Sequence, residues 1–105
     1  MRLQSAYNLF LFIVLSICFS SLNSYAQKPT AKTFFDIGVE NAKNVEYSEA
    51  IDNFKHAIKL KPDYAEAYFN LGHSYYSLHR YNEAVDSYKK AVKIKPRFEE
   101  ALISL

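Results

Sequence analysis

The chain has few of the residues from which catalytic and metal-binding sites are usually built. Its single cysteine, Cys18, lies in an apolar run near the amino terminus, and there is no tryptophan. If that run is removed on export, the remaining chain holds no cysteine. A disulfide, a thiol nucleophile and a cysteine metal site are then excluded, although export would permit disulfides.

Glycine and proline are also scarce, with two and three copies. There is no glycine-rich phosphate loop, and no apolar run alternates at period two, so no strand is expected. Half of the residues are apolar, 16% are aromatic and 23% are charged, which is typical of one small globular module. The formal charge of +2 is too small to indicate an acidic partner.

The three histidines, His56, His73 and His79, do not have the spacing of a metal site. His73 and His79 are separated by about 600° of rotation on a helix, whereas helical metal pairs stand three or four residues apart. The sequence also holds no Ser-His-Asp set on separate loops and no carboxylate pair in an apolar pocket. We therefore predict no catalytic residue, no cofactor and no metal.

Cations gather towards the carboxyl terminus at Lys89, Lys90, Lys93, Lys95 and Arg97. Acidic residues stand among and opposite them, and cations near the end of a helix complement its dipole. We interpret the cluster as a solvated face and predict no binding of nucleic acid.

Residues 1–26 have the organisation of a secretory signal peptide. Arg2 precedes an eleven-residue apolar core, Leu9–Phe19, and small residues at Ser24 and Ala26 suit a signal peptidase. We expect cleavage after Ala26 and export to a periplasm or the medium, with no membrane anchor afterwards. Residues 27–30 then form a short linker.

Two rival interpretations of this segment are less favoured. A membrane anchor needs roughly 20 apolar residues, and polar residues from Ser20 onward end this run early. A lipoprotein signal would end in a cysteine such as Cys18, but Ile17 stands where that signal needs a small residue.

The two glycines reveal an internal repeat, because Gly38 and Gly72 lie 34 residues apart. At the same offset, nine of sixteen residues are identical between Tyr47–Pro62 and Tyr81–Pro96. A fixed period of this length indicates a stacked repeat architecture. The paired positions are Phe34 and Tyr68, Ile37 and Leu71, Ala50 and Ala84, Phe54 and Tyr88, and Pro62 and Pro96.

The second copy reads Tyr68-x₂-Leu71-Gly72-x₂-Tyr75, followed by Ala84-x₃-Tyr88 and Pro96. This pattern resembles the tetratricopeptide repeat, a helix–turn–helix unit. The resemblance covers two full repeats, 31–64 and 65–98, and the start of a third at 99–105. It implies an all-α helical repeat solenoid, with helices near 31–44, 47–61, 64–78 and 81–95. The first copy departs from the pattern at Asn41.

Helix ends and crossing points can also be assigned. Ser48 and Asn82 have N-cap side chains followed by an acid, and Asp63 with Glu66 has the capping-box spacing. Proline then ends the second helix of each copy. Glycine within a helix costs about 1 kcal/mol, which indicates that Gly38 and Gly72 allow a close helix approach. We expect the glycines to face Ala50 and Ala84.

In the tetratricopeptide family, the first helix of each repeat lines a concave groove that binds a peptide or a partner helix. The resemblance therefore implies a non-catalytic protein–protein interaction scaffold. A chaperone-type carboxylate clamp is rejected, because only Asn70 matches its inner-face pattern. The implied groove residues are Phe35, Val39, Phe69, Asn70, His73 and Tyr76, with Lys32, Lys43, Glu66 and Ser77 beside them.

The carboxyl end stays apolar at Ala101, Leu102, Ile103 and Leu105, where a repeat array usually ends in a polar helix. We interpret this as a truncated array, or as an end completed by another protein or another copy. Two alternatives to groove binding remain. One is self-association through this open end, and the other is a module that positions substrate for a larger exported enzyme.

Overall fold

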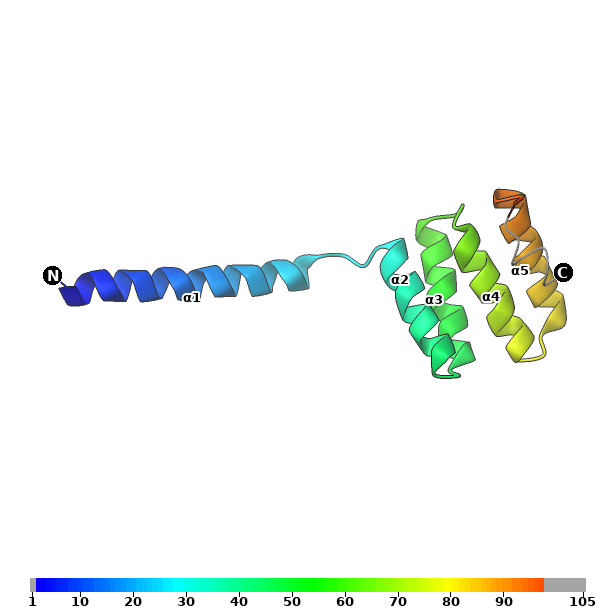
Figure 1. The fold of residues 1–105 in the computed structure, drawn as a ribbon, viewed down its shortest axis with the longest axis horizontal. Coiled ribbons are helices and arrows are strands. Elements are labelled where there is room, and N and C mark those ends of the chain that lie inside the picture. The colour runs from blue at the N-terminus through cyan, green and yellow to red at the C-terminus, as the bar shows by residue number, and fades with distance from the viewer. Residues whose placement is uncertain (1, 98–105) are drawn as a thin grey trace.

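A computed structural model describes residues 2–97 of the chain, and within that range the protein is built of helices without strands. Helices α2 to α5 stand side by side as two antiparallel pairs, while α1 extends away from them (Figure 1). The predicted all-α repeat architecture is confirmed, and residues 98–105 lie outside the described part. The helices are α1 (Arg2–Ala26), α2 (Ala31–Lys43), α3 (Tyr47–Leu60), α4 (Ala65–Ser77) and α5 (Tyr81–Ile94).

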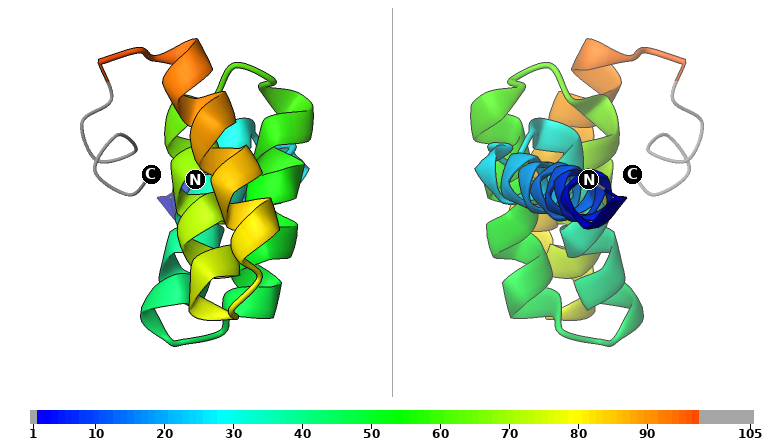
Figure 2. Two further views of the ribbon diagram at one scale, coloured as in Figure 1. Left: turned by 90° about the vertical axis from the view of Figure 1, so that its right-hand side faces the viewer. Right: turned by 90° about the vertical axis from the view of Figure 1, so that its left-hand side faces the viewer.

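Helix α1 is apolar and lies apart from the four repeat helices (Figure 1), and Figure 2 shows the molecule along the axis of α1 from both sides. Its stretch Gln4–Asn23 has 20 residues, a mean hydropathy of 1.8 and no buried part. The hydroxyls of Ser20 and Ser21 donate to the carbonyls of Ser16 and Ile17, each at 3.0 Å. The serines therefore do not end the apolar helix early, and the length argument against an anchor fails. A signal sequence passes the same test of length and composition.

The predicted caps are wrong at three of the helix starts. Helices α3 and α5 begin one residue before Ser48 and Asn82, so both of these residues lie inside the first turn. Asp63 does not cap α4, whose cap position is held by Tyr64 without a side-chain bond. Among the starts of α2 to α5, only that of α2 has a capping box, in which the hydroxyls of Thr30 and Thr33 each accept the other's backbone N–H at 3.2 Å.

The starts of α3 and α5 are decided by the turns that precede them. Val45 and His79, one period apart, adopt left-handed φ values of 65° and 61°. At the first turn, the N–H of Glu46 donates to the carbonyl of Asn41 at 2.9 Å, and that of Val45 to Ala42 at 3.1 Å. These two bonds define a Schellman motif, and the second turn repeats both of them. The residue after each left-handed position, Glu46 or Arg80, is also the cap residue of the next helix, and neither makes a side-chain capping bond.

The departure at Asn41 preserves this turn by other means. Its amide donates to the Glu46 carboxylate at 2.9 Å and accepts from the amide of Asn53 at 2.9 Å. In the second repeat, Tyr75 holds the same position, and the Arg80 guanidinium lies 4.8 Å from the centre of its ring. Both pairs join the residues that a Schellman motif brings together, so α2 forms in full despite the substitution.

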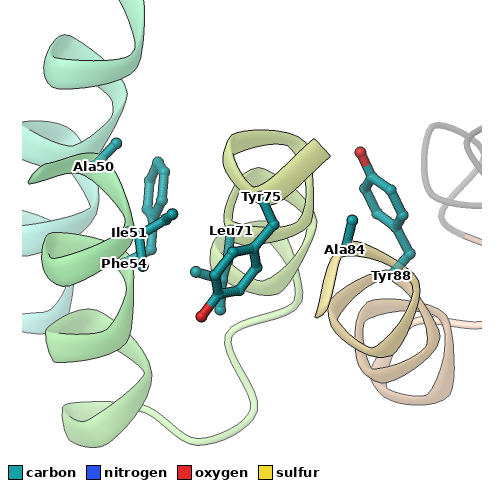
Figure 3. Packing of buried hydrophobic residues seen from close by; sticks show 7 residues of the cluster. All are labelled: Ala50, Ile51, Phe54, Leu71, Tyr75, Ala84 and Tyr88. Atoms are coloured by element: carbon teal, nitrogen blue, oxygen red, sulfur yellow. The ribbon is translucent and has the colours of Figure 1, made fainter. Parts of the chain in front are cut away.

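The core explains the two glycines. A Cβ on Gly38 would lie 2.7 Å from the Phe54 ring, and one on Gly72 would lie 2.8 Å from the Tyr88 ring. The expectation that alanines face the glycines is confirmed only in part. The nearest atoms are ring atoms at both positions, and the carbonyl oxygen of Ala84 is third, at 3.1 Å from the Gly72 Cβ. The cluster is drawn in Figure 3 and comprises Ala50, Ile51, Phe54, Leu71, Tyr75, Ala84 and Tyr88.

Equivalent positions differ in burial because the repeats have different neighbours. Leu71 is 6% exposed and Tyr75 is 5% exposed, since α4 packs on α3 of the preceding repeat. Ile37 is equivalent to Leu71 but is 45% exposed, because no preceding repeat covers α2 in the described chain. Asn41, equivalent to Tyr75, is polar, which suits a surface at the edge of an array.

Candidate partner-binding groove

The six groove residues lie on α2 and α4, the first helices of the two repeats, which contact each other directly. The structure therefore brings them to neighbouring helices, as the resemblance implied. Their assignment to a partner site stays a prediction, and their environments divide them into three kinds.

Phe35, Val39 and Phe69 are half-buried and belong partly to the packing of the repeats. The Phe35 ring stacks on Tyr64 with centroids 5.0 Å apart, and burial, followed by the charge of Asp36, raises the pKa of Tyr64. Phe69, one period later, lies 5.6 Å from the ring of Tyr88. These rings can form the floor of a binding face, but each also holds neighbouring helices together.

Asn70 is half-buried, and its amide donates to the carbonyl of Glu66 at 2.8 Å. One of its donors is therefore engaged within α4. The amide oxygen retains its capacity to accept a bond from a partner.

His73 and Tyr76 are exposed, and they offer the most accessible polar and aromatic groups of the six. Tyr76 is 56% exposed, and the edge of its ring approaches Tyr81 with centroids 5.2 Å apart. The hydroxyl of Tyr81 is 2.7 Å from Nδ1 of His79, and this hydrogen bond holds the Tyr81 ring in place beside Tyr76. A rigid ring held in this way can bury a large area at low entropic cost.

Charged residues beside the groove are paired within the chain. Lys32 and Asp36 approach to 2.7 Å, and so do Lys95 and Glu66. The hydrogen bond from Lys95 is the main reason that the pKa of Glu66 is lowered, and the bond to Asp36 raises the pKa of Lys32. The other flanking pair is looser, with 3.8 Å between Lys43 and Glu40. The flanks are thus largely neutralised, which leaves the aromatic residues as the distinctive feature.

A cavity that the sequence did not predict lies between α3, α4 and α5, and none of the six predicted groove residues lines it. Its volume is about 320 Å³, and Tyr68, Leu71 and Tyr75 form its apolar part. The ammonium groups of Lys55 and Lys90 lie 5.8 Å from the rings of Tyr75 and Tyr68. The chain's own cations therefore already cover these rings.

The histidines do not meet in a common site. His56 stacks on Phe34 with centroids 5.1 Å apart, while His79 bonds to Tyr81. Within residues 2–97, no group of three or more histidine, cysteine, aspartate or glutamate side chains is placed to hold a metal ion.

Two family models match the chain. The model described as "Tetratricopeptide repeat" matches residues 65–102, and the model described as "TPR repeat" matches residues 46–78. Together they cover residues 46–102, more than half of the sequence. No curated protein matches the chain.

Solved structures agree with the family models. Two crystal structures of MamA are 36% identical to this chain with a TM-score of 0.68, and the alignments cover 70% of this chain. They cover 43% and 40% of the MamA chains, so this chain spans less than half of their length. A tetratricopeptide repeat domain protein from Salinibacter ruber is 24% identical with a TM-score of 0.63, covering 74% of this chain and 91% of that one, and shows the fold alone. The chain therefore belongs to the tetratricopeptide repeat family, whose repeats generally mediate protein–protein interactions.

Proposed function

We propose that the face shared by α2 and α4 binds a protein or peptide partner, and that the chain itself is not an enzyme. The observation that carries the proposal is Tyr76, whose ring is 56% exposed beside His73 on the helix that also holds half-buried Phe69. Aromatic residues with one exposed face are enriched at the centres of interfaces. The exposed ring of Tyr76, together with the half-buried rings of Phe35 and Phe69, could form a small apolar contact surface for a partner.

The chemistry of the partner follows from the charges around the face. Lys32 and Glu66 are already engaged with Asp36 and Lys95. We therefore expect apolar or aromatic side chains of the partner to supply most of the affinity, with hydrogen bonds to His73 and Asn70 setting its register. An extended peptide and an amphipathic helix both satisfy this description.

The test compares two sets of variants in a capture experiment from exported proteins. Tyr76→Ala with His73→Ala should remove a captured partner without unfolding the chain, because both side chains are exposed. Val85→Ala, exposed on α5, is the matched control and should keep it. Phe69 packs on Tyr88, so Phe69→Ala can also destabilise the fold. Loss of capture by this variant therefore counts only if its thermal unfolding curve matches that of the unchanged protein. Equal capture by all variants would refute the proposal.

We also propose that the protein is exported and that α1 is removed after Ala26. The support is the apolar helix at the amino terminus and the small residues before Gln27. Amino-terminal sequencing of the protein recovered from its host should begin at Gln27. An intact mass that retains α1 would disprove cleavage and favour an anchor.

Self-association is the second candidate, and exposed apolar residues at the edges of the array favour it. Ile37 on α2 is 45% exposed and Val85 on α5 is 40% exposed. Mass measured by size exclusion over a concentration series should then rise, and Val85→Asp should abolish the rise. A constant monomer mass would leave partner binding as the remaining role.

A further inference from the structure

The charges of the repeats are distributed unequally along the helices. Because the four helices alternate in direction, the starts of α2 and α4 and the ends of α3 and α5 lie at one end, next to the linker (Figure 1). We call this the linker end, and it comprises residues 27–34, 57–68 and 91–97. The opposite end comprises residues 40–50 and 74–84.

The linker end carries seven cations against two acids, a net charge of +5, and the opposite end carries two cations against four acids, a net charge of −2. All of the seven cations are exposed. Among described residues, five of them have no carboxylate within 4.0 Å, the exceptions being Lys32 and Lys95. These five are Lys28, Lys59, Lys61, Lys93 and Arg97.

Helix dipoles account for only part of this arrangement. Lys59 and Lys93 lie in the last turns of α3 and α5, and Lys61 and Lys95 hold the C-cap positions of these helices, where a cation is favourable. Lys32 lies in the first turn of α2, where the dipole disfavours a cation, and Lys28 lies outside any helix. The dipoles therefore do not explain Lys28, Lys32 or Arg97, and Lys32 is paired with Asp36. The net charge of +5 at the linker end makes this surface suited to an anionic partner.

The position of α1 indicates which anionic partner. Its 20-residue apolar stretch is long enough to cross a bilayer. The linker between α1 and α2, residues 27–30, spans at most about 14 Å when fully extended. That reach is comparable to a Debye length of about 8–10 Å, so the linker end is held within the electrostatic range of the headgroups whenever α1 is in the membrane.

We propose that, while α1 lies in a bilayer, the linker end docks on anionic phospholipid headgroups. This docking requires the linker to turn from the arrangement in Figure 1, where α1 runs across the helix axes of the repeats. The axes then stand away from the membrane, and the acidic opposite end points outward. Tyr76 belongs to the opposite end and His73 adjoins it, so the partner-binding face is away from the headgroups. The proposal is separate from partner binding and concerns the full chain, before or without cleavage after Ala26.

The experiment uses the full chain in vesicles of phosphatidylcholine, with or without phosphatidylglycerol, and measures acylation of lysines by mass spectrometry. Helix α1 inserts in both kinds of vesicle, so only the headgroup charge differs. Acylation at Lys59, Lys61 and Lys93, relative to Lys43 at the opposite end, should fall several-fold with phosphatidylglycerol at low salt. High salt should restore it, because exposed charges are screened.

A matched pair of variants tests whether position, and not total charge, is responsible. Lys59→Glu with Lys93→Glu should remove the protection of Lys61. Lys55→Glu with Lys89→Glu changes the same charge on the same two helices one turn further from the linker end, and should retain the protection. Helical content measured by circular dichroism confirms that both variants are folded. Equal acylation in the two kinds of vesicle, or equal loss of protection in both variants, would overturn the proposal.

Discussion

Replacing Gly72 by alanine tests the packing on which the repeat depends. A Cβ at this position would lie 2.8 and 2.9 Å from two atoms of the Tyr88 ring and 3.1 Å from the carbonyl oxygen of Ala84. Tyr88 is only 3% exposed, and the ring of Phe69 lies against it. The ring therefore has little room to withdraw, and the carbonyl belongs to the backbone of α5.

Two opposing terms set the expected magnitude. Overpacking a filled core typically costs about 1–3 kcal/mol. Alanine in a helix interior gains about 1 kcal/mol over glycine. We expect a net loss of up to about 2 kcal/mol for Gly72→Ala, which corresponds to a melting temperature lower by as much as roughly 8–16 °C in a domain of this size. The loss should be visible in thermal unfolding of the chain from Gln27 onward, followed by circular dichroism.

A double-mutant cycle isolates the contact between the new methyl group and the ring. In a Tyr88→Leu background the ring atoms are absent, so Gly72→Ala should be close to neutral or stabilising through helix propensity. Ser48→Ala, at an exposed position inside α3, is the control for propensity alone and should stabilise slightly. If Gly72→Ala raised the melting temperature, or had the same effect in both backgrounds, the reasoning from ring packing would be refuted.

Two further predictions concern the turn and the ion pair. Val45 is 68% exposed and holds a left-handed φ of 65°, a backbone conformation that is strained for valine and not for glycine. Val45→Gly should therefore raise the free energy of unfolding by about 1 kcal/mol. An unchanged midpoint of urea unfolding would show that this backbone strain is absent. The Lys95 bond lowers the folded-state pKa of Glu66 from 4.5, so ionised Glu66 stabilises the fold above that pH and this contribution is lost as the pH falls through the lowered pKa. Glu66→Gln should therefore reduce stability at pH 7 by at most about 1 kcal/mol, since the pair is partly exposed, with the difference vanishing in acid. A difference that persisted in acid would assign the effect to something other than the ion pair.

Sequence predictions that depend on a few adjacent residues were correct, whereas those that depend on hydrogen bonds between more distant residues were not. Proline and the repeat period gave the ends of α3 and α5 to within one or two residues, because a proline two positions after each helix cannot continue it. Ser48 and Asn82 have the intrinsic preference for a cap, yet each lies inside a helix. The Schellman turn before them fixes where the chain enters the next helix, and that turn is stabilised by bonds across residues that no local pattern singles out.

By itself, the sequence determined the period of 34 residues, the helical class and the helices that pair, because these depend on spacing and on the intrinsic preferences of glycine and proline. Only the tertiary structure decided how much of each side chain a neighbouring helix covers. Thus Leu71 and Ile37 hold the same place in the pattern, but one is buried and the other exposed. Phe69 and Tyr76 were assigned to one groove, and both rings contact α5, but Phe69 is half-buried and Tyr76 is 56% exposed. The reason is that burial depends on distances between helices, and the order of residues within one helix does not contain them.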